Sequence, residues 1–535
     1  MSQISVSHLS FSYDTSAEPI FSDVSFELDT DWKLGFIGRN GRGKTTFLNL
    51  LLGKFPYSGT ITASVSFEYF PFPAANPTLC AFDLVKDLVA PFRQWEQEME
   101  RLLSHADEDS LTRYGEIQGV YQSYGGYEIE AKIRREAAKL ELSDALLSRR
   151  FDTLSLGEQT KVLLAGLFLK ENRFLLIDEP TNHLDMHGRR VLSRYLNSKQ
   201  GFLLVSHDRA FLNGCIDHTL SINRADIEVL RGNFDTWQRQ KDLRDHYELA
   251  RNERLKTEIR ELEQAKRRTA GWSDAVESSK KGTRIAGLRP DRGFIGRKAA
   301  KMMKQAKSLE RRQQTAIEEK NGLLKNLEQS DALKLHVLEH PKQRLVEVQS
   351  LSIDYGNGPL FPPLSFAIQS GERVSLSGRN GSGKSSILKL LLGEDIPHTG
   401  QIWMASGMQI SYVAQDTSHL SGTPAGYAEA HGLDRTLFFT VLRKLGFARS
   451  QFELNTAQMS GGQKKKILLA AGLCTPAHLF VLDEPLNFID IISRMQIEEL
   501  ILQANPTLLF IEHDETFCAH VATRRIVLAK REMGI

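Results

Sequence analysis

One eight-residue motif occurs twice in this chain, and its recurrence constrains the fold more than any other feature. Gly38-Arg-Asn-Gly-Arg-Gly-Lys44-Thr45 reappears as Gly378-Arg-Asn-Gly-Ser-Gly-Lys384-Ser385. Each copy follows a short apolar run, as a phosphate-binding loop between a strand and a helix does. In such a loop the glycines let backbone N–H groups surround phosphate, the lysine reaches the outer phosphates and the hydroxyl binds Mg²⁺. The repeat predicts two α/β halves that each bind a phosphate-containing ligand.

The length of the chain agrees with at least two domains. Its 535 residues exceed the roughly 250 to 300 that one hydrophobic core supports. The longest apolar runs, such as Phe202 to Val205, are far shorter than the roughly 20 residues that cross a bilayer. The residues after Met1 lack the basic start and apolar stretch of a secretory signal. We therefore expect a cytoplasmic protein without a membrane partner.

Two further apolar segments each end in a pair of carboxylates. Arg173-Phe-Leu-Leu-Ile-Asp178-Glu179-Pro180 and His478-Leu-Phe-Val-Leu-Asp483-Glu484-Pro485 read as buried parallel strands. Ligands of α/β folds bind at such strand ends. The aspartate of each pair is expected to hold Mg²⁺ through water, and the glutamate to orient or deprotonate an attacking water.

A histidine follows a further apolar strand in each half, at His207 and His513, and is expected to hydrogen-bond the γ-phosphate. Taken alone, Asp-Glu after a strand is often only a turn, and one histidine is more often a packed or solvated residue. The order of the motifs favours the functional interpretation, because the phosphate loop, the signature, the paired carboxylates and the histidine occur twice in the same order.

The signatures are Leu154-Ser155-Leu156-Gly157-Glu158-Gln159 and Met459-Ser460-Gly461-Gly462-Gln463. With them, the chain resembles ATP-binding-cassette (ABC) domains. In that family the signature of one domain, at a helix N-terminus, closes over the γ-phosphate bound by the other domain. The resemblance implies two ATP molecules sandwiched between the halves of one chain, and hydrolysis of ATP to ADP and phosphate.

The same resemblance assigns nucleotide and metal contacts to individual residues. Tyr13 and Tyr355 resemble the aromatic residue that stacks on adenine, and the alternative is an ordinary core tyrosine. The other expected ATP contacts are Gly38, Arg39, Asn40, Gly41, Arg42, Gly43, Lys44, Thr45, Thr46, Ser155 and Gly157, together with Gly378, Arg379, Asn380, Gly381, Ser382, Gly383, Lys384, Ser385, Ser386, Ser460, Gly461 and Gly462. The expected Mg²⁺ ligands are Thr45, Asp178, Ser385, Gln415 and Asp483.

Departures from the family pattern predict that the two sites differ. Leu156 replaces a signature glycine and adds a side chain where backbone should approach phosphate. Gln415 matches the glutamine that senses Mg²⁺, whereas the first half has Tyr69-Phe-Pro-Phe-Pro73 at that place. The first half also has 111 residues from Lys44 to Ser155, where the second has 76 from Lys384 to Ser460. A longer helical subdomain within Trp95 to Leu142 is expected, with a tyrosine-rich contact surface as the alternative.

The segment between the halves, roughly Gln238 to Arg344, predicts a helical hairpin. Leu255, Ile259 and Leu262 share one helix face in its first arm, Glu248 to Gln264, and the second arm, Leu309 to Leu327, has a similar pattern. We therefore expect three regions: residues 1–237 and 345–535 as ATPase domains, and 238–344 as a basic α-helical linker.

The charge of this linker predicts its partner. From residue 266 to 312, fifteen Lys or Arg stand against four acidic residues, although the whole chain carries only +2. Trp272, Phe294, Met302 and Met303 are interleaved among them. A charge run is usually a solvated face, but solvated helical faces alternate in sign and this one is nearly all positive. RNA is the expected partner, with cations on phosphates and aromatic residues on bases.

Twin cassettes joined by a basic linker resemble the ABC-F family of translation-associated ATPases. The segments Trp32 to Thr46 and Gly293 to Met303, with the missing first glutamine, are similar to Lsa-type resistance proteins. Those protect ribosomes from lincosamides, pleuromutilins and streptogramin A compounds. The resemblance implies a monomer that binds the ribosome, both rRNA and tRNA, through the linker tip from Trp272 to Met303, with no DNA partner. A housekeeping ABC-F factor that relieves stalled ribosomes and the ATPase subunit of a transporter are the alternatives.

Overall fold

The computed structural model describes residues 3–13, 19–105, 107–222, 227–279, 335–356, 358–447 and 449–529, with isolated helical residues between 301 and 315. The chain divides into two compact units. One contains Met1–Asp235 together with Ser330–Ile535, and the other contains Thr236–Gln329. Within the larger unit we call residues 3–235 the first half and residues 335–529 the second half.

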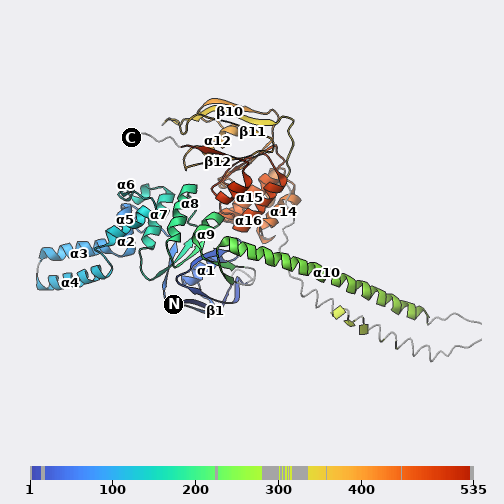
Figure 1. Cartoon of the computed structure of the whole chain (residues 1–535), viewed down its shortest axis with the longest axis horizontal. Helices are drawn as coiled ribbons and strands as arrows, with labels where there is room; N and C mark the ends of the chain where they lie inside the picture. Colours follow the sequence, from blue (N-terminus) through green and yellow to red (C-terminus); the bar gives the residue numbers. More distant parts are fainter. Residues whose placement is uncertain are drawn as a thin grey trace, which may run out of the picture. The chain divides into compact units, whose positions relative to one another are not determined.

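The first half contains a mainly parallel sheet and a separate antiparallel sheet (Figure 1). In the mainly parallel sheet the strand order is β5-β6-β7-β3-β8-β9, and β9 pairs antiparallel with β8. The antiparallel sheet has the order β2-β1-β4. The strands are β1 (Gln3–Phe11), β2 (Phe21–Asp29), β3 (Lys33–Ile37), β4 (Ser58–Ala63), β5 (Ser66–Phe70), β6 (Arg173–Asp178), β7 (Phe202–Val205), β8 (His218–Ile222) and β9 (Ile227–Arg231).

The second half repeats this topology, except that its described residues contain no equivalent of β9. Its parallel sheet has the order β14-β15-β16-β12-β17 and its antiparallel sheet the order β11-β10-β13. The predicted tandem α/β fold, with two cassette domains separated by a long helical region, is confirmed. The strands are β10 (Arg344–Ile353), β11 (Leu364–Gln369), β12 (Arg373–Gly378), β13 (His398–Met404), β14 (Ile410–Val413), β15 (Leu479–Asp483), β16 (Leu508–Ile511) and β17 (Arg524–Leu528).

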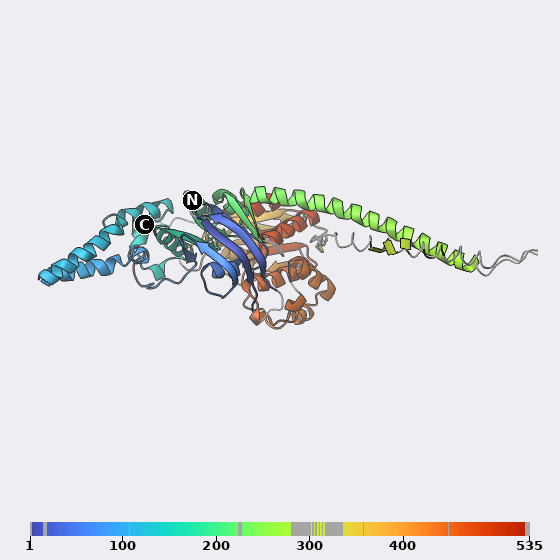
Figure 2. The same cartoon turned by 90° about the horizontal axis from the view of Figure 1, so that it is seen from below.

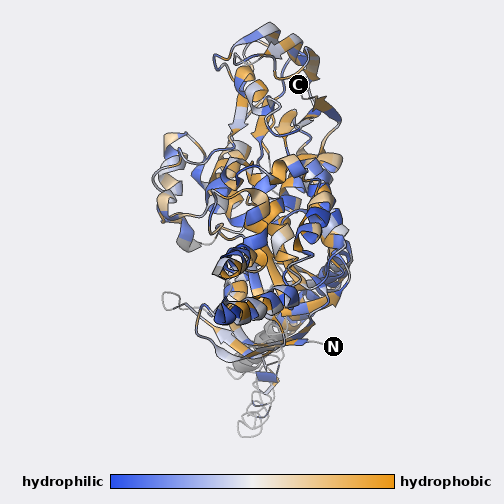
Figure 3. Ribbon diagram, turned by 90° about the vertical axis from the view of Figure 1, so that its left-hand side faces the viewer, coloured by the Kyte–Doolittle hydropathy of each residue, from blue (hydrophilic) through white to orange (hydrophobic). Residues whose placement is uncertain are grey.

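The central strands are apolar because helices cover both faces of a parallel sheet. Residues 174–177 of β6 and 479–482 of β15 are all buried. Figure 3, coloured by hydropathy, shows hydrophobic residues concentrated toward the middle of the ribbon. The helices of the first half are α1 (Lys44–Leu51), α2 (Ala81–Val89), α5 (Ile129–Lys139), α6 (Asp144–Leu147), α7 (Leu156–Leu167), α8 (Met186–Asn197) and α9 (Arg209–Cys215). Those of the second are α12 (Lys384–Leu391), α13 (Pro424–Ala430), α14 (Arg435–Lys444), α15 (Gly461–Cys474), α16 (Ile491–Ala504) and α17 (Glu515–Val521).

The extra segment of the first half is helical, as expected. α3 (Phe92–His105) and α4 (Glu108–Ser123) lie side by side (Figure 2). Phe92 and Tyr121 hold them together through an edge-to-face ring contact with centroids 5.6 Å apart.

The smaller unit contains most of the long helix α10 (Phe234–Ser279), which includes the predicted first arm. Most of the predicted second arm lies outside the described residues, as do Phe294, Met302, Met303 and the side chain of Trp272. No helix in the described ranges is long and apolar enough to cross a bilayer.

Candidate functional site

Each phosphate loop ends in a glycine whose backbone favours no other residue. Gly43 has φ 95° and Gly383 has φ 88°, the left-handed region in which a Cβ is strained. A Cβ on Gly43 would also lie 2.5 Å from Ile20. Neither α1 nor α12 has a side-chain cap, so the first N–H groups of both helices remain available to an anion.

The loop lysines are buried and turn onto their own loops. Nζ of Lys44 donates to the carbonyl of Gly38 at 2.6 Å, and Nζ of Lys384 to that of Gly378 at 2.9 Å. Burial lowers the pKa of both lysines. Each cation is therefore held within the loop, where a phosphate would replace the carbonyl partners and offset the cost of burial.

A hydroxyl and a carboxylate face each other beside each loop. Oγ1 of Thr45 lies 3.4 Å from Oδ2 of Asp178, and Oγ of Ser385 lies 3.3 Å from Oδ1 of Asp483. Burial raises the pKa of Asp178, and raises that of Asp483 to about 6. A cation between hydroxyl and carboxylate would stabilise the ionised form.

This donor set fits Mg²⁺. No group of three or more His, Cys, Asp or Glu suited to a metal occurs among the described residues. Mg²⁺ does not need one, because it is usually held by one or two protein oxygens, substrate phosphates and water.

The two glutamates that follow have the same unusual backbone. Glu179 has φ 49° and Glu484 has φ 45°. Their amides donate to the next strand, Glu179 to Val205 at 2.9 Å and Glu484 to Ile511 at 3.0 Å. Nε2 of the predicted histidine lies 3.3 Å from the carboxylate in the first half and 3.4 Å from it in the second. Strand pairing and a left-handed residue thus place each glutamate beside its histidine.

The surroundings of the two carboxylates differ. Glu484 accepts hydrogen bonds from Nε2 of Gln415 at 2.8 Å and Nδ2 of Asn487 at 2.5 Å. Burial acts to raise its pKa, but His513, Asn487 and Lys384 outweigh burial and lower the pKa below the ordinary value. Gln415, expected as a metal ligand, donates to this carboxylate.

Within the described ranges, no side-chain amide donates to Glu179 as Gln415 and Asn487 do to Glu484. Oε1 of Glu179 is buried without a hydrogen-bond partner among the described residues. Burial and repulsion from Asp178 raise the pKa of Glu179 to about 8. Burial thus favours the neutral form of Glu179, whereas the groups around Glu484 favour its ionised form.

Two cavities combine the phosphate loop of one half with the signature of the other. The cavity at the first loop measures about 550 Å³, and the cavity at the second about 1060 Å³. The first is lined by Asn40, Gly41, Lys44, Thr45, Asp178, Glu179 and His207, with Ser460, Gly461 and Gly462 from the other half. The second is lined by Arg379, Asn380, Gly381, Ser382, Gly383, Lys384, Ser385, Ser386, Gln415, Glu484 and His513, with Ser155, Leu156 and Gly157 from the other half.

The signature helices begin alike. Ser155 and Ser460 each close a capping box, with Glu158 and Gln463 respectively. Leu156 is 56% exposed and occupies the first position of α7, where α15 has Gly461. The side chain that departs from the signature pattern therefore projects from the helix start that lines the larger cavity.

The two predicted adenine-stacking tyrosines are placed alike. The hydroxyl of Tyr13 lies 3.0 Å from Oγ1 of Thr46, and that of Tyr355 donates to Oγ of Ser386 at 3.1 Å. Tyr13 also meets the ring of Phe11 edge-on, with centroids 5.0 Å apart. Each tyrosine is thus fixed to the first turn of its loop helix.

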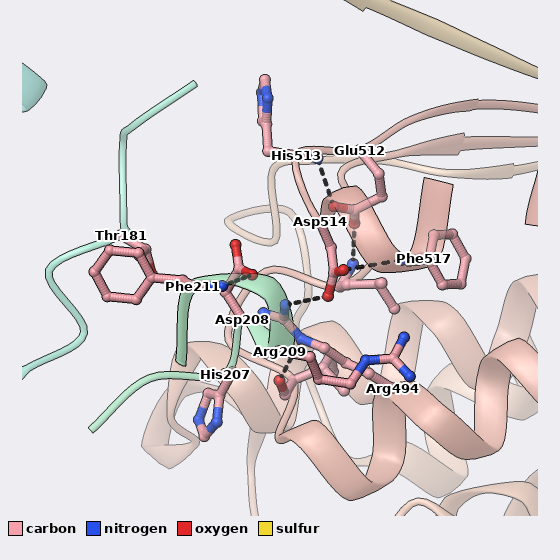
Figure 4. Close-up of polar contacts among 12 residues, drawn as sticks. Thr181, His207, Asp208, Arg209, Phe211, Arg494, Glu512, His513, Asp514 and Phe517 are labelled. Carbon is pink, nitrogen blue, oxygen red and sulfur yellow. Dashed lines mark hydrogen bonds and ion pairs between the residues drawn. The ribbon is translucent and has the colours of Figure 1, made fainter. Parts of the chain in front are cut away.

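Buried ion pairs lie behind the histidines, and the sequence analysis missed them. Arg189 contacts Asp208 at 2.8 Å. Arg494 contacts Asp514 at 3.1 Å, and Figure 4 labels this second pair. Arg189 also donates to the backbone carbonyl of His513 in the other half, at 3.2 Å. Both arginines stand four residues after the aspartate that caps their helix, a repeat that alignment of the halves would have revealed.

A buried lysine in the second half was also missed. Nζ of Lys465 donates to the carbonyls of Ala414 at 2.7 Å and Asp483 at 3.2 Å. Burial lowers its pKa to about 8. It joins the segment directly after β14, which carries Gln415, to the carboxylate strand β15.

Comparison with known proteins agrees with this geometry. A family model described as ABC transporter matches residues 21–182 and 361–487. The Energy-dependent translational throttle protein EttA of Haemophilus influenzae is 26% identical, over 94% of this chain and 88% of its own length. The Ribosome protection protein VmlR of Bacillus subtilis is 26% identical, over 97% and 85%. A solved structure, RNase-L Inhibitor, has a TM-score of 0.59 at 18% identity, over 97% of this chain and 87% of that one.

Proposed function

Because the chain belongs to the ABC transporter family and is an ABC-F ATPase with two cassettes, we propose that it uses ATP to control its binding to the ribosome. The observation that carries the proposal is the reciprocal construction of the two cavities, each from the loop of one half and the signature of the other. A nucleotide in either cavity contacts both halves. Because a nucleotide that contacts both halves binds their closed arrangement more tightly than an open one, nucleotide binding favours the closed arrangement.

ATP hydrolysis follows from the cassette domains, and we assign its steps to the residues placed above. Lys44 and Lys384, with the amides at the starts of α1 and α12, hold the outer phosphates. Glu179 and Glu484 orient the attacking water and receive its proton, and His207 and His513 hydrogen-bond the γ-phosphate. Mg²⁺ neutralises phosphate charge when it is bound. The residues that would hold it are Thr45 and Asp178 in the first site, and Ser385, Asp483 and Gln415 in the second.

The ribosome is proposed as the partner on two grounds. One relative is named as a translational throttle protein and another as a ribosome protection protein. The basic stretch from residue 266 to 312 concentrates cations that suit rRNA and tRNA phosphates. The action is therefore cytoplasmic, with a single chain pairing its own halves.

We propose protection against antibiotics of the peptidyl-transferase centre as the specific role. It rests on the similarity of residues 32–46 and 293–303 to Lsa-type proteins and on the relative named for ribosome protection. A housekeeping role in stalled translation is the second candidate, favoured by the relative named as a translational throttle.

Co-sedimentation with ribosomes tests the coupling to ATP. The Glu179→Gln, Glu484→Gln variant should bind ATP without hydrolysing it and sediment with ribosomes in ATP. The Lys44→Ala, Lys384→Ala variant, which loses phosphate binding, is the matched control and should stay in the supernatant. Equal sedimentation with and without ATP would contradict the proposal.

Drug susceptibility then separates the two roles. Wild-type protein in a sensitive strain should raise the inhibitory concentration of a lincosamide or pleuromutilin. The Glu179→Gln, Glu484→Gln variant at equal expression should not, because it fails to leave the ribosome. No change with the wild-type protein would favour the housekeeping role.

A further inference from the structure

Two ion pairs join the halves at equivalent places. On one side, Arg190 of α8 binds Glu515 at the start of α17, with Nε 3.1 Å from Oε2. On the other side, Arg209 at the start of α9 binds Glu498 of α16. Helix α8 of the first half corresponds to α16 of the second, and α9 corresponds to α17. The contact of α8 with α17 is therefore equivalent to the contact of α9 with α16, and each contains one of the two ion pairs.

The signs of the charges do not follow this equivalence of the two contacts. Arg209 and Glu515 hold the same position, each directly after the aspartate that caps its helix. The first half supplies both arginines and the second half supplies both glutamates. By contrast, the bonds from Asn40 to the Phe488 carbonyl and from Asn380 to the His183 carbonyl use the same chemistry in both directions. Those bonds would form equally well between two copies of one half.

We propose that this charge polarity makes a first half pair with a second half and reject another first half, and makes a second half likewise reject another second half. Two first halves would place Arg209 opposite α8, which carries Arg190 and offers Ser193 at the position equivalent to Glu498. Two second halves would place Glu515 opposite Glu498. Either arrangement sets like charges together and leaves them without the partner that the native pairing provides.

Burial decides which pair matters more. The side chains of Arg209 and Glu498 are 8% and 10% exposed, whereas those of Arg190 and Glu515 are 60% and 41% exposed. Exposed pairs contribute little, but a buried charge that loses its partner is strongly unfavourable. The discrimination therefore rests mainly on Arg209 and Glu498, and loss of one partner should weaken pairing roughly 100-fold. His520 also hydrogen-bonds Glu498 within the second half and keeps that carboxylate oriented.

Charge exchange in the full chain tests the proposal without ribosomes, so its result is independent of the proposed ribosome function. Arg209→Glu sets two carboxylates together in the native pairing. It also makes the first half self-complementary, since Arg190 of one chain can then bind the new carboxylate of another. ATP hydrolysis should fall at least about tenfold, and light scattering in ATP should detect dimers that the wild-type chain does not form.

The double variant Arg209→Glu, Glu498→Arg restores an opposite pair and should recover hydrolysis to within a few-fold of wild type. Arg194→Glu is the matched control. Arg194 lies on α8 but pairs with Glu141 of its own half at 3.2 Å, so this variant should stay monomeric and active. If Arg209→Glu is monomeric and fully active, the proposal is overturned. If Arg209→Glu misfolds, the double variant decides: recovery supports the proposal, and no recovery overturns it.

Discussion

Nδ2 of Asn40 in the first phosphate loop donates a hydrogen bond of 3.0 Å to the backbone carbonyl of Phe488 in the second half. Asn380 makes the equivalent bond of 3.2 Å to the carbonyl of His183. Phe488 has φ 62° and His183 has φ 65°, a conformation that costs a residue other than glycine about 1 kcal/mol or more. Each phosphate loop is thus tied to the strained turn that follows the carboxylates of the opposite half.

We expect Asn40→Ala to weaken closure of the halves. Loss of one hydrogen bond costs about 1 kcal/mol. The ATP concentration that gives half-maximal hydrolysis should therefore rise about fivefold. Steady-state hydrolysis over a range of ATP concentrations measures this. Asn380→Ala should behave similarly, and unchanged ATP dependence in both variants would show that these bonds do not support closure.

The two glutamates predict different responses of ATP hydrolysis to pH. In a Glu484→Gln background, only the first site hydrolyses ATP, and its glutamate has a pKa of about 8. A base must be ionised to accept a proton, so this activity should fall about tenfold for each pH unit below 8. In a Glu179→Gln background, activity should change little between pH 6.5 and about 7.5, because the pKa of Glu484 is lowered. Initial rates across this range compare the two, and identical profiles would contradict the assignment.

Leu156 should limit the second site. Leu156→Gly, made in the Glu179→Gln background, removes the side chain at the start of α7 and should raise hydrolysis severalfold, at a stability cost of about 1 kcal/mol. The reverse change, Gly461→Leu in the Glu484→Gln background, should lower first-site hydrolysis on the order of tenfold. A Cβ at Gly461 would meet its nearest neighbour at 3.8 Å, so the variant can fold. Equal rates with and without Leu156 would argue against this role.

Arg494→Ala should destabilise the second half strongly. Asp514 is 0% exposed and would keep a charge without its partner, at a cost of about 3–5 kcal/mol. Chemical denaturation followed by circular dichroism measures the loss. The double variant Arg494→Met, Asp514→Asn should regain much of it, because the amide removes the unpaired charge and still caps α17. Arg194→Ala, an exposed change, should shift the transition by less than about 0.5 kcal/mol.

Much of the site could be predicted because its chemistry recurs at fixed intervals. A loop such as residues 38–45 fixes its own backbone through glycine and begins a helix, so its structure follows from local sequence. The apolar runs before Asp178 and Asp483 identify buried strands, and strand ends place carboxylates at the ligand-binding edge. The missing glutamine near Tyr69 was also visible as a difference between the two copies.

The tandem α/β fold, the two phosphate loops and the carboxylates beside them could be read from local patterns, because each is encoded in contiguous residues. Which charges face one another depends on how the folded elements pack. Glu179 and Glu484 occupy identical positions in the sequence, yet burial and the donors Gln415 and Asn487 give them different pKa values. The pairing of Arg209 with Glu498 joins residues 289 positions apart. Such contacts depend on the packing of whole elements, which no local pattern encodes.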